Sequence, residues 1–510
     1  LYRAPSLDWA LSGQTGVRFN RDDAFRRISR SFHAVKDSEY APPASLQKTL
    51  RKYQRDGYRW LRTLDGYGMG GILADDMGLG KTVQVLSYLL AMKQNGQTLP
   101  SLIVCPASLV LNWAEECQKF TPELSCVVVD GDAAHRAELA ESWPAADLVV
   151  TSYDLLRRDE ALYEGQEFYA CILDEAQAIK NHTTQKYKAV CKVRSRVRFA
   201  LTGTPVENRL GELWSIFSFL MPGYLPPYKS FCSRFEKPIV QEEDQTAVRR
   251  LNQLTGPFIL RRMKADVLKE LPPKTENVYR IELEEEQRKL YLAAVVDARE
   301  KLQAAKPEDK MAVFAVLMRL REICCDPRLI ADNWEGGSAK LDACAELVSS
   351  AVEGGHRILL FSQFTSMLEL LAKRLDAEGI SHFTLQGSTP KPVRAELVRR
   401  FNGGEVSVFL ISLRAGGTGL NLTAADIVIH YDPWWNVAAQ NQATDRAYRI
   451  GQQNPVQVYK LIAQDTIEEK IVELQQAKQS LADTVTGTAD GAILSMRPDE
   501  LLQLLEGSEP

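Results

Sequence analysis

Apolar residues along this chain fall into short unbroken runs that alternate with longer stretches of helical periodicity. The first set of runs covers 71–74, 102–106, 127–130, 148–153, 170–174 and 199–205. A second set covers 357–362, 382–387, 406–412, 427–432 and 456–460. Continuous apolar runs separated by helices are typical of strands that are buried on both faces of a parallel sheet. The pattern therefore predicts an α/β fold with two parallel-sheet units and helices on both faces of each sheet.

The stretches between and around these sets predict the division of the chain. Residues 1–44 mix short apolar pieces with charges and end in Ala41-Pro42-Pro43-Ala44, which indicates the tail of a preceding domain and a linker. The further predicted parts are 45–208 as the first sheet unit, 209–270 as its helical insertion and a crossover, 271–338 as a linker and a helical insertion of the second unit, 339–480 as the second sheet unit, and 481–510 as a C-terminal extension.

A polar, glycine-rich stretch follows the first apolar run and precedes a helical pattern. It reads Asp75-Asp76-Met77-Gly78-Leu79-Gly80-Lys81-Thr82. A glycine-rich turn between a strand and a helix directs backbone N–H groups at one point, where the helix dipole also favours negative charge. Lys81 can then reach the terminal phosphates of a nucleotide, and the Thr82 hydroxyl can hold Mg²⁺. Because Asp75 stands where the general pattern has Gly, an ordinary glycine-rich turn is the alternative for this stretch taken alone.

Two adjacent carboxylates, Asp174 and Glu175, end the fifth apolar run. Ligands of parallel sheets bind beyond the carboxyl ends of the strands, so this is a position for site residues. Asp174 suits Mg²⁺, and Glu175 could orient or deprotonate an attacking water. An isolated Asp-Glu pair is more often an exposed acidic turn. The apolar run before it and the upstream Lys81 favour the catalytic interpretation.

Two further segments carry candidate chemistry. Gln54 offers a donor and an acceptor that suit an adenine edge, although alone it reads as a surface residue. In the second half, Arg446 and Arg449 are three residues apart, which places them on one face of a predicted helix. Arginine suits phosphate binding and charge neutralisation in phosphoryl transfer. A pair of solvated surface arginines is the alternative.

Composition narrows the class of protein. The 510 residues are 45% hydrophobic and 25% charged, which predicts a soluble globular chain of two to four domains. A net charge of -4 excludes a chain that is basic throughout, but not a basic cleft. Nine cysteines without a C-x-x-C pair indicate reduced core thiols and not a zinc site.

No apolar run approaches the roughly 18–20 residues of a membrane span and no signal-peptide pattern is present, so we expect a cytoplasmic, nucleoid-associated protein. The first residue is Leu, which predicts a fragment of a longer protein.

With both halves in view, the chain resembles the Swi/Snf-type ATPases, which are double-stranded DNA translocases of helicase superfamily 2. The resemblance covers about residues 46–475 and suggests the catalytic core of a bacterial or archaeal member. The matching segments are Arg51 to Gln54 (adenine-reading Gln motif), Asp75 to Thr82 (the family's own phosphate loop), Asp174 to Asn181 (motif II), Leu201 to Asn208 (motif III), Ser412 to Asp426 (motif V), Gln442 to Gln452 (motif VI), and the Swi/Snf-type blocks Phe258 to Lys264 and Asp432 to Asn436. Gln177 and Tyr448 stand where His is common, and both can still form hydrogen bonds.

This resemblance implies two RecA-like lobes that bind ATP and Mg²⁺ between them. The implied catalytic residues are Lys81, Asp174 and Glu175 from the first lobe, with Arg446 and Arg449 from the second as arginine fingers. The implied nucleotide contacts are Gln54, Asp76, Met77, Gly78, Leu79, Gly80, Lys81, Thr82, Gly417 and Gly419, and the implied metal ligands are Thr82 and Asp174.

Double-stranded DNA is the expected partner. The candidate phosphate contacts are Ser108, Asn112, Trp113, Thr151 and Ser152 in the first lobe, and Gln363, Gly387, Arg414 and Thr418 in the second. Short polar side chains and backbone N–H groups grip phosphates without reading bases, so binding should be independent of sequence and sensitive to salt. Six basic residues between Lys186 and Arg198 either add to a DNA face or form a solvated helix and strand edge. For Trp434-Trp435 we expect packing between motifs and not stacking on a base.

The resemblance thus predicts an ATP-dependent translocase that closes two lobes on duplex DNA and moves protein–DNA complexes without separating the strands. A protein bound to the DNA would be a further partner. The main alternative is a strand-separating helicase on DNA or RNA, which single strands would stimulate. The second alternative is a nucleotide-binding scaffold without turnover, against which the intact Lys81, Glu175 and both arginines argue.

Overall fold

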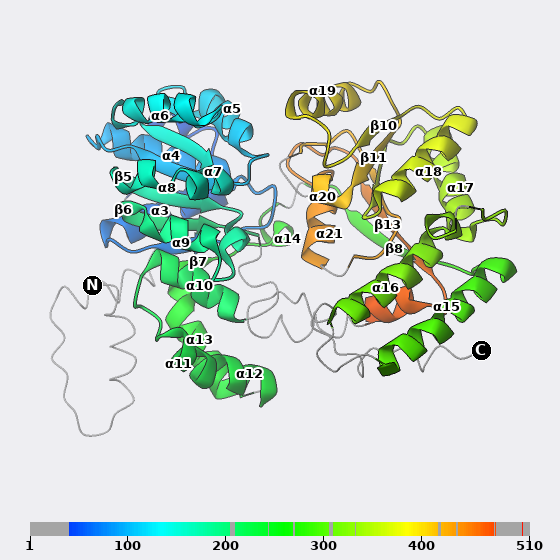
Figure 1. Ribbon diagram of the computed structural model, residues 1–510. Helices are drawn as coiled ribbons and strands as arrows, with labels where there is room; N and C mark the ends of the chain where they lie inside the picture. The colour runs from blue at the N-terminus through cyan, green and yellow to red at the C-terminus, as the bar shows by residue number, and fades with distance from the viewer. Residues whose placement is uncertain are drawn as a thin grey trace. The chain divides into compact units, whose positions relative to one another are not determined.

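The chain forms two compact units, Leu1–Lys269 and Glu270–Pro510 (Figure 1). The computed structural model describes residues 40–203, 210–242, 244–268, 271–304, 310–331, 333–416, 420–434, 437–473, 475 and 502.

The first unit is built on a seven-stranded parallel sheet. Its strands are β1 (Gly71–Leu73), β2 (Ser101–Cys105), β3 (Cys126–Val128), β4 (Leu148–Ser152), β5 (Glu167–Asp174), β6 (Arg194–Leu201) and β7 (Ile259–Leu260), in the order β3-β4-β2-β5-β6-β1-β7. All residues of β1, β2 and β4 are buried, as the unbroken apolar runs predicted. Strand β7 joins the sheet from the segment that the sequence assigned to a crossover, because Ile259 and Leu260 pair with Ile72 and Leu73 of β1.

Helices cover this sheet, and several begin at side-chain caps. The helices are α3 (Lys52–Gly66), α4 (Lys81–Gln94), α5 (Val110–Phe120), α6 (Ala133–Ser142), α7 (Tyr153–Arg158), α8 (Glu160–Glu164), α9 (Gln185–Lys192), α10 (Leu210–Leu220), α11 (Tyr228–Phe231), α12 (Lys237–Gln241), α13 (Gln245–Thr255) and α14 (Lys264–Val267). Ser152, Thr184 and Asp244 accept hydrogen bonds from the first turns of α7, α9 and α13. In Figure 1, α11, α12 and α13 group together at one end of the unit.

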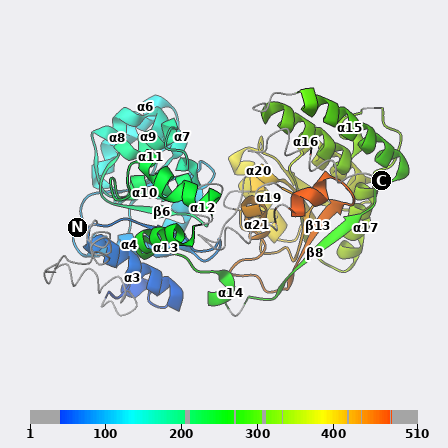
Figure 2. The same ribbon diagram turned by 90° about the horizontal axis from the view of Figure 1, so that it is seen from below.

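The second unit holds a six-stranded parallel sheet in the order β10-β11-β9-β12-β13-β8. The strands are β8 (Lys274–Ile281), β9 (Ile358–Ser362), β10 (His382–Leu385), β11 (Val408–Ser412), β12 (Ile427–His430) and β13 (Val456–Ala463). Two parallel sheets with many helices confirm the predicted fold class. Strand β8 lies beside β13 at the sheet edge (Figure 2). Seven of its eight residues are exposed, so it lacks the apolar run by which a strand is recognised, and the sequence had placed it in a linker.

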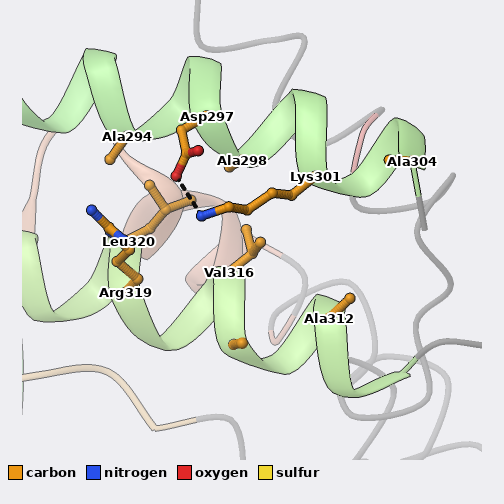
Figure 3. Close-up of a pocket in the computed structure, with 10 residues that line it drawn as sticks. Ala294, Asp297, Ala298, Lys301, Ala304, Ala312, Val316, Arg319 and Leu320 are labelled. Atoms are coloured by element: carbon orange, nitrogen blue, oxygen red, sulfur yellow. Dashed lines mark hydrogen bonds and ion pairs between the residues drawn. The ribbon is translucent and has the colours of Figure 1, made fainter.

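The helices of the second unit include a long pair that precedes the main part of its sheet. They are α15 (Glu285–Ala304), α16 (Lys310–Cys325), α17 (Ala339–Glu353), α18 (Thr365–Ala377), α19 (Lys391–Asn402), α20 (Leu413–Gly416) and α21 (Val437–Thr444). A cavity of about 450 Å³ lies between α15 and α16, and an ion pair of 2.8 Å joins Asp297 and Lys301 at its side (Figure 3). None of the predicted site residues lines this cavity.

Two buried ion pairs connect distant parts of the second unit. Arg321 of α16 meets Asp432 at 3.1 Å, and both side chains are almost completely buried. Lys340 at the start of α17 meets Glu468 at 2.5 Å, and neither side chain is exposed. No helix within the described ranges is long and apolar enough to span a bilayer.

Candidate ATP-binding site

The register of the first sheet brings two predicted motifs to one edge. Leu73 at the end of β1 is aligned with Leu201 of β6, and Leu201 is aligned with Asp174 at the end of β5. The strands are parallel, so their carboxyl ends meet at the same edge. The glycine-rich loop after β1 and the carboxylates after β5 therefore lie at this edge, separated by one strand.

Two glycines shape the loop between β1 and α4. Gly78 has φ 82° and Gly80 has φ 75°, the left-handed region that residues with a Cβ rarely adopt. A Cβ on Gly80 would also lie 2.6 Å from Nε2 of Gln54. Helix α4 begins directly at Lys81, and the first N–H groups of a helix have no partner within the helix. The loop thus ends in the positive end of a helix dipole, which favours an anion such as phosphate.

Side chains hold the carbonyl oxygens of this loop. The Asp75 carbonyl accepts a hydrogen bond from Nζ of Lys81 at 2.7 Å. The Leu79 carbonyl accepts from the Tyr53 hydroxyl at 3.0 Å and from Nε2 of Gln54 at 3.1 Å. The Gly80 carbonyl accepts from Nε2 of Gln84 at 3.1 Å. Because an anion is bound by N–H groups and repelled by carbonyl oxygens, a loop whose carbonyls are bound to side chains is preorganised for phosphate.

Gln54, the predicted adenine reader, is buried near the beginning of α3. Its Oε1 accepts a hydrogen bond from the backbone N–H of Arg51 at 2.9 Å, while its Nε2 donates to Leu79. The amide thus joins the start of α3 to the phosphate loop. A base that binds Gln54 has to share or replace these hydrogen bonds, so its contact with adenine stays a prediction.

Asp174 is buried and has two hydrogen-bond donors. Nε1 of Trp113 donates to one carboxylate oxygen at 2.9 Å, and the backbone N–H of Glu175 donates to the other at 2.9 Å. Burial, together with the neighbouring Glu175 carboxylate, raises the pKa of Asp174 to about 7, against the lowering effects of Trp113 and Lys81. A cation at this carboxylate would stabilise its charged form.

The donor set of this edge fits Mg²⁺, with the Asp174 carboxylate and the Thr82 hydroxyl as oxygen ligands. The described ranges hold no group of three or more His, Cys, Asp and Glu residues that could bind a metal by themselves. Mg²⁺ that arrives with a nucleotide needs only one or two protein ligands, because phosphates and waters supply the others. The assignment of Thr82 and Asp174 to the metal remains a prediction.

Glu175 has a strained backbone. Its φ of 49° and ψ of 56° are left-handed, and Asp465 is the other non-glycine residue with positive φ in the described part of the chain. Such a conformation costs about 1–3 kcal/mol and persists where the surroundings enforce it, commonly at functional sites. The Glu175 carboxylate accepts from Nε2 of Gln177 at 2.8 Å, and Oε1 of Gln177 accepts from the Thr202 hydroxyl at 3.0 Å. Gln177 therefore does form hydrogen bonds, and it connects the end of β5 with the end of β6.

The structure argues against side-chain contacts to DNA for three of the predicted residues. Trp113 is 1% exposed and its indole binds Asp174. Thr151 is fully buried and its hydroxyl accepts from Tyr163 at 2.9 Å. Ser152 is 3% exposed and caps α7. DNA cannot reach these side chains, because they are buried within the first unit. Ser108 and Asn112 are partly exposed.

Three of the six basic residues between Lys186 and Arg198 have partners within the first unit. Lys186 meets Asp154 at 3.0 Å, and Lys192 forms ion pairs with Glu160 and Glu164. Arg198 donates to the carbonyls of Phe219, Cys191 and Val193. These contacts favour the interpretation as a solvated helix and strand edge over a DNA face.

In the second unit, the sequence predicted a helix around Arg446 and Arg449, and this prediction is wrong. Helix α21 ends at Thr444, and both arginines lie in the turns that follow. Arg446 is 4% exposed, and Nη1 of Arg449 donates to the carbonyl of Leu420 at 3.3 Å. These turns return to the core, since the backbone N–H of Leu422 donates to the carbonyl of Arg446. The predicted common helical face therefore does not exist, and the arginine-finger role rests on the resemblance of motif VI alone.

The other predicted residues of the second unit differ in accessibility. Gln363 is partly buried after β9, and its N–H donates to Asp432. Gly387 is exposed after β10. Trp434 packs against an apolar cluster of the second unit that includes Leu422 and Ala447, which agrees with the expected packing between motifs. Gly417, Thr418, Gly419, Trp435, most of motif III and the side chain of Arg414 lie outside the described residues.

Two residues that shape this site were not assigned to it from the sequence. Trp113 was assigned to DNA, although its indole holds the Asp174 carboxylate. Arg262 was seen only as part of a family block, although it pairs with Asp75 across 187 residues. An arginine close behind the apolar segment Phe258-Ile259-Leu260 was the signal that could have pointed to a buried carboxylate partner.

Comparison with known proteins identifies the family of the chain. The SNF2-related domain matches residues 53–329, more than half of the chain, and the helicase conserved C-terminal domain matches 339–451. The chain therefore belongs to the SNF2-related family of ATP-hydrolysing, helicase-like enzymes.

Several relatives cover most of the chain. An uncharacterized ATP-dependent helicase of Mycoplasma genitalium is 40% identical over 90% of this chain and 44% of its own length. YwqA of Bacillus subtilis, a putative ATP-dependent helicase/translocase, is 39% identical over 97% of this chain and 55% of its own. The TATA-binding protein-associated factor MOT1 of Saccharomyces cerevisiae is 34% identical over 94% and 30%. The chain thus spans about half the length of the first two and less of the third. The Sulfolobus solfataricus SWI2/SNF2 ATPase core in complex with dsDNA is 36% identical, with a TM-score of 0.45, over 89% of this chain and 96% of that one.

Proposed function

We propose that this chain is a DNA-dependent ATPase that converts ATP hydrolysis into movement along duplex DNA without separating the strands. The observation that carries the proposal is the meeting of the Gly78–Thr82 loop with Asp174 and Glu175 at one sheet edge, in a chain of the SNF2-related family. Family membership supports the ATPase, and the resemblance to Swi/Snf-type motors supports duplex DNA as the partner.

The first unit supplies most of the chemistry in this proposal. The loop N–H groups and Lys81 bind the phosphates, for which Lys81 leaves the Asp75 carbonyl that it binds in this structure. Thr82 and Asp174 would hold Mg²⁺, which neutralises phosphate charge when bound. Glu175 orients the attacking water and accepts its proton, while Gln177 fixes the carboxylate.

The second unit contributes Arg446 and Arg449 as arginine fingers. An arginine finger is worth about 10³–10⁵ in rate, because it stabilises the charge of the transition state. Hydrolysis then requires closure of the two units on the nucleotide, and this closure is the mechanical step. Arg446→Ala should lower kcat by about 10³ or more while ATP binding is largely kept. Hydrolysis by Arg446→Ala near the wild-type rate would contradict the role.

DNA binding in this proposal uses the backbone of the duplex. Ser108 and Asn112 in the first unit and Gln363, Gly387, Arg414 and Thr418 in the second remain candidate phosphate contacts. Such contacts carry no sequence information, and binding should weaken steeply with salt. A protein on the DNA that is moved or displaced would be the target of the whole protein.

Steady-state ATP hydrolysis is the decisive test. The rate is measured with no nucleic acid, with duplex DNA, with single-stranded DNA and with RNA, and Glu175→Gln serves as the blank. Strong stimulation by duplex DNA alone is expected. Stimulation by single strands or RNA would favour the strand-separating helicase instead. If the chain binds ATP but hydrolyses none of it under all four conditions, it is a nucleotide-binding scaffold.

A further inference from the structure

A largely buried arginine, Arg262, contacts three residues around the phosphate loop, namely Asp75, Gln84 and Tyr53. Its Nε donates to Oδ1 of Asp75 at 2.7 Å, and its Nη2 pairs with the other oxygen of the same carboxylate. Nη2 also donates to Oε1 of Gln84 at 2.7 Å, and Nη1 donates to the backbone carbonyl of Tyr53. The side chain of Arg262 is 12% exposed and that of Asp75 is fully buried. A bidentate arginine pair of this kind fixes both position and orientation.

The partners of Arg262 lead directly to the loop. Gln84 is fully buried, and its Nε2 donates both to Asp75 and to the carbonyl of Gly80. Tyr53, whose carbonyl Arg262 binds, donates its hydroxyl to the carbonyl of Leu79. Arg262 therefore acts through one intervening residue on two of the carbonyl oxygens that must be turned away from a bound phosphate.

The backbone around Arg262 is tied to the same loop. The carbonyl of Leu260 accepts from the N–H of Ala74 at 2.7 Å, and the carbonyl of Arg262 accepts from the N–H of Asp76 at 3.1 Å. The N–H of Lys264 donates to the Asp76 carboxylate at 2.9 Å. The segment 259–264 thus extends the sheet beside β1, and the boundary of the first unit follows at Lys269.

Gly57 of α3 leaves the space that this arrangement needs. A Cβ on Gly57 would lie 1.8 Å from Oε1 of Gln84 and 2.9 Å from Nη2 of Arg262. Gly within a helix normally lowers stability relative to Ala, so its presence here has a packing reason. That reason is the approach of the Gln84 amide and the Arg262 guanidinium to the helix backbone.

We propose that Arg262 is a positioning residue of the ATP site, which sets the phosphate loop through Asp75, Gln84 and Tyr53. It also connects the loop mechanically to the segment that leaves the first unit. Asp75, which stands where a glycine is usual in phosphate loops, is in this view the anchor for Arg262 and not a phosphate ligand. The inference rests on the proposed nucleotide site, since it assigns how that site is held.

The test is the nucleotide affinity of the whole 510-residue chain carrying Arg262→Lys, which keeps the charge and loses the bidentate geometry. The control is Arg136→Lys. Arg136 pairs with Asp159 in the same unit at 2.6 and 2.9 Å and also donates to the backbone carbonyl of Gly131. Among the described residues, these partners lie away from the Gly78–Thr82 loop. Binding of a fluorescent ATP analogue, the KM and kcat for ATP, and the thermal midpoint are measured for wild type and both variants.

Both substitutions should lower the thermal midpoint. Only Arg262→Lys should raise the dissociation constant and the KM, by roughly tenfold to a hundredfold, since a displacement of about 1 Å in a binding group has effects of this size. Equal dissociation constants for Arg262→Lys, Arg136→Lys and wild type would overturn the proposal. A structural role alone would reduce the active fraction and hence kcat, with KM unchanged. A wild-type chain that binds no nucleotide would instead overturn the proposed function.

Gly57→Ala provides a second variant if Arg262→Lys does not fold. Its control is Gly66→Ala in the same helix, where a new Cβ would meet only the Tyr40 hydroxyl at 3.2 Å. Gly57→Ala should weaken nucleotide binding by a similar factor, whereas Gly66→Ala should leave it unchanged. Unchanged nucleotide binding by a folded Gly57→Ala variant would contradict the proposed role of the Arg262 network.

Discussion

The hydrogen bond from Trp113 to Asp174 gives the most direct test of how the site is held. The indole Nε1 is 2.9 Å from Oδ2 of Asp174, and Trp113 is 1% exposed. Trp113→Phe keeps an aromatic ring in the core and removes this donor. Loss of a hydrogen bond to a charged group costs about 1.5–3 kcal/mol. Loss of a partner that orients a metal ligand typically costs about 10–100-fold in metal affinity or activity, which corresponds to a similar free energy.

The assay is ATP hydrolysis with duplex DNA at increasing Mg²⁺ concentration. Trp113→Phe should shift the half-saturating Mg²⁺ concentration upward by about 10–100-fold, and excess Mg²⁺ should restore much of the rate. Because Trp113 is buried, affinity for duplex DNA without nucleotide should not change. This second readout separates the role found here from the DNA contact that the sequence suggested.

A matched control is present in the same unit. Trp143 is fully buried, and its Nε1 has no hydrogen-bond partner within the described ranges. Trp143→Phe removes the same atoms from a core position without removing a hydrogen bond, so it should leave the Mg²⁺ dependence at the wild-type value. If both variants show the same Mg²⁺ dependence, Trp113 does not orient Asp174, and the reasoning is refuted.

Two further predictions concern the second unit. Burial lowers the pKa of His430 to about 3. As the pH falls below about 6.5, the unfolded chain therefore binds a proton at this histidine that the folded chain does not bind. The free energy of unfolding then falls by up to about 1.4 kcal/mol per pH unit. Urea unfolding at pH 7 and pH 5 should therefore show a smaller loss for His430→Gln than for wild type, and equal losses would refute the assignment. Lys340→Met leaves the buried Glu468 without its partner and should cost about 3–5 kcal/mol, whereas Lys340→Met with Glu468→Leu should recover most of it. Additive losses in the double variant, measured by urea unfolding, would contradict this coupling.

Much of the first unit could be predicted because its signals are local. The segments 102–105 and 148–150 are entirely apolar, and a strand buried on both faces requires this. The loop Gly78–Thr82 and the pair Asp174-Glu175 are each contiguous, so each could be recognised as a candidate motif from the sequence. In contrast, β8 has exposed side chains and becomes a strand only through its pairing with β13.

Local sequence patterns were misleading where the fold gives a side chain another hydrogen-bond partner or ends a helix early. Thr151 and Ser152 end a strand, as DNA-contacting residues would, but one hydroxyl binds Tyr163 and the other caps α7. Arg446 and Arg449 have helical spacing, but the chain leaves the helix at Thr444. Spacing describes only what a regular element would do, and tertiary contacts decide whether the element continues.

The sequence by itself predicted two parallel-sheet units, the glycine-rich loop and the acidic strand end, because these signals lie in residues adjacent in the chain. Tertiary structure alone decided that Trp113 holds Asp174 and that Arg262 holds Asp75, pairs that are 61 and 187 residues apart. The physical reason is that a buried polar group must find a partner wherever the fold brings one within about 3 Å. Sheet register and helix packing set these approaches, and no spacing along the chain encodes them.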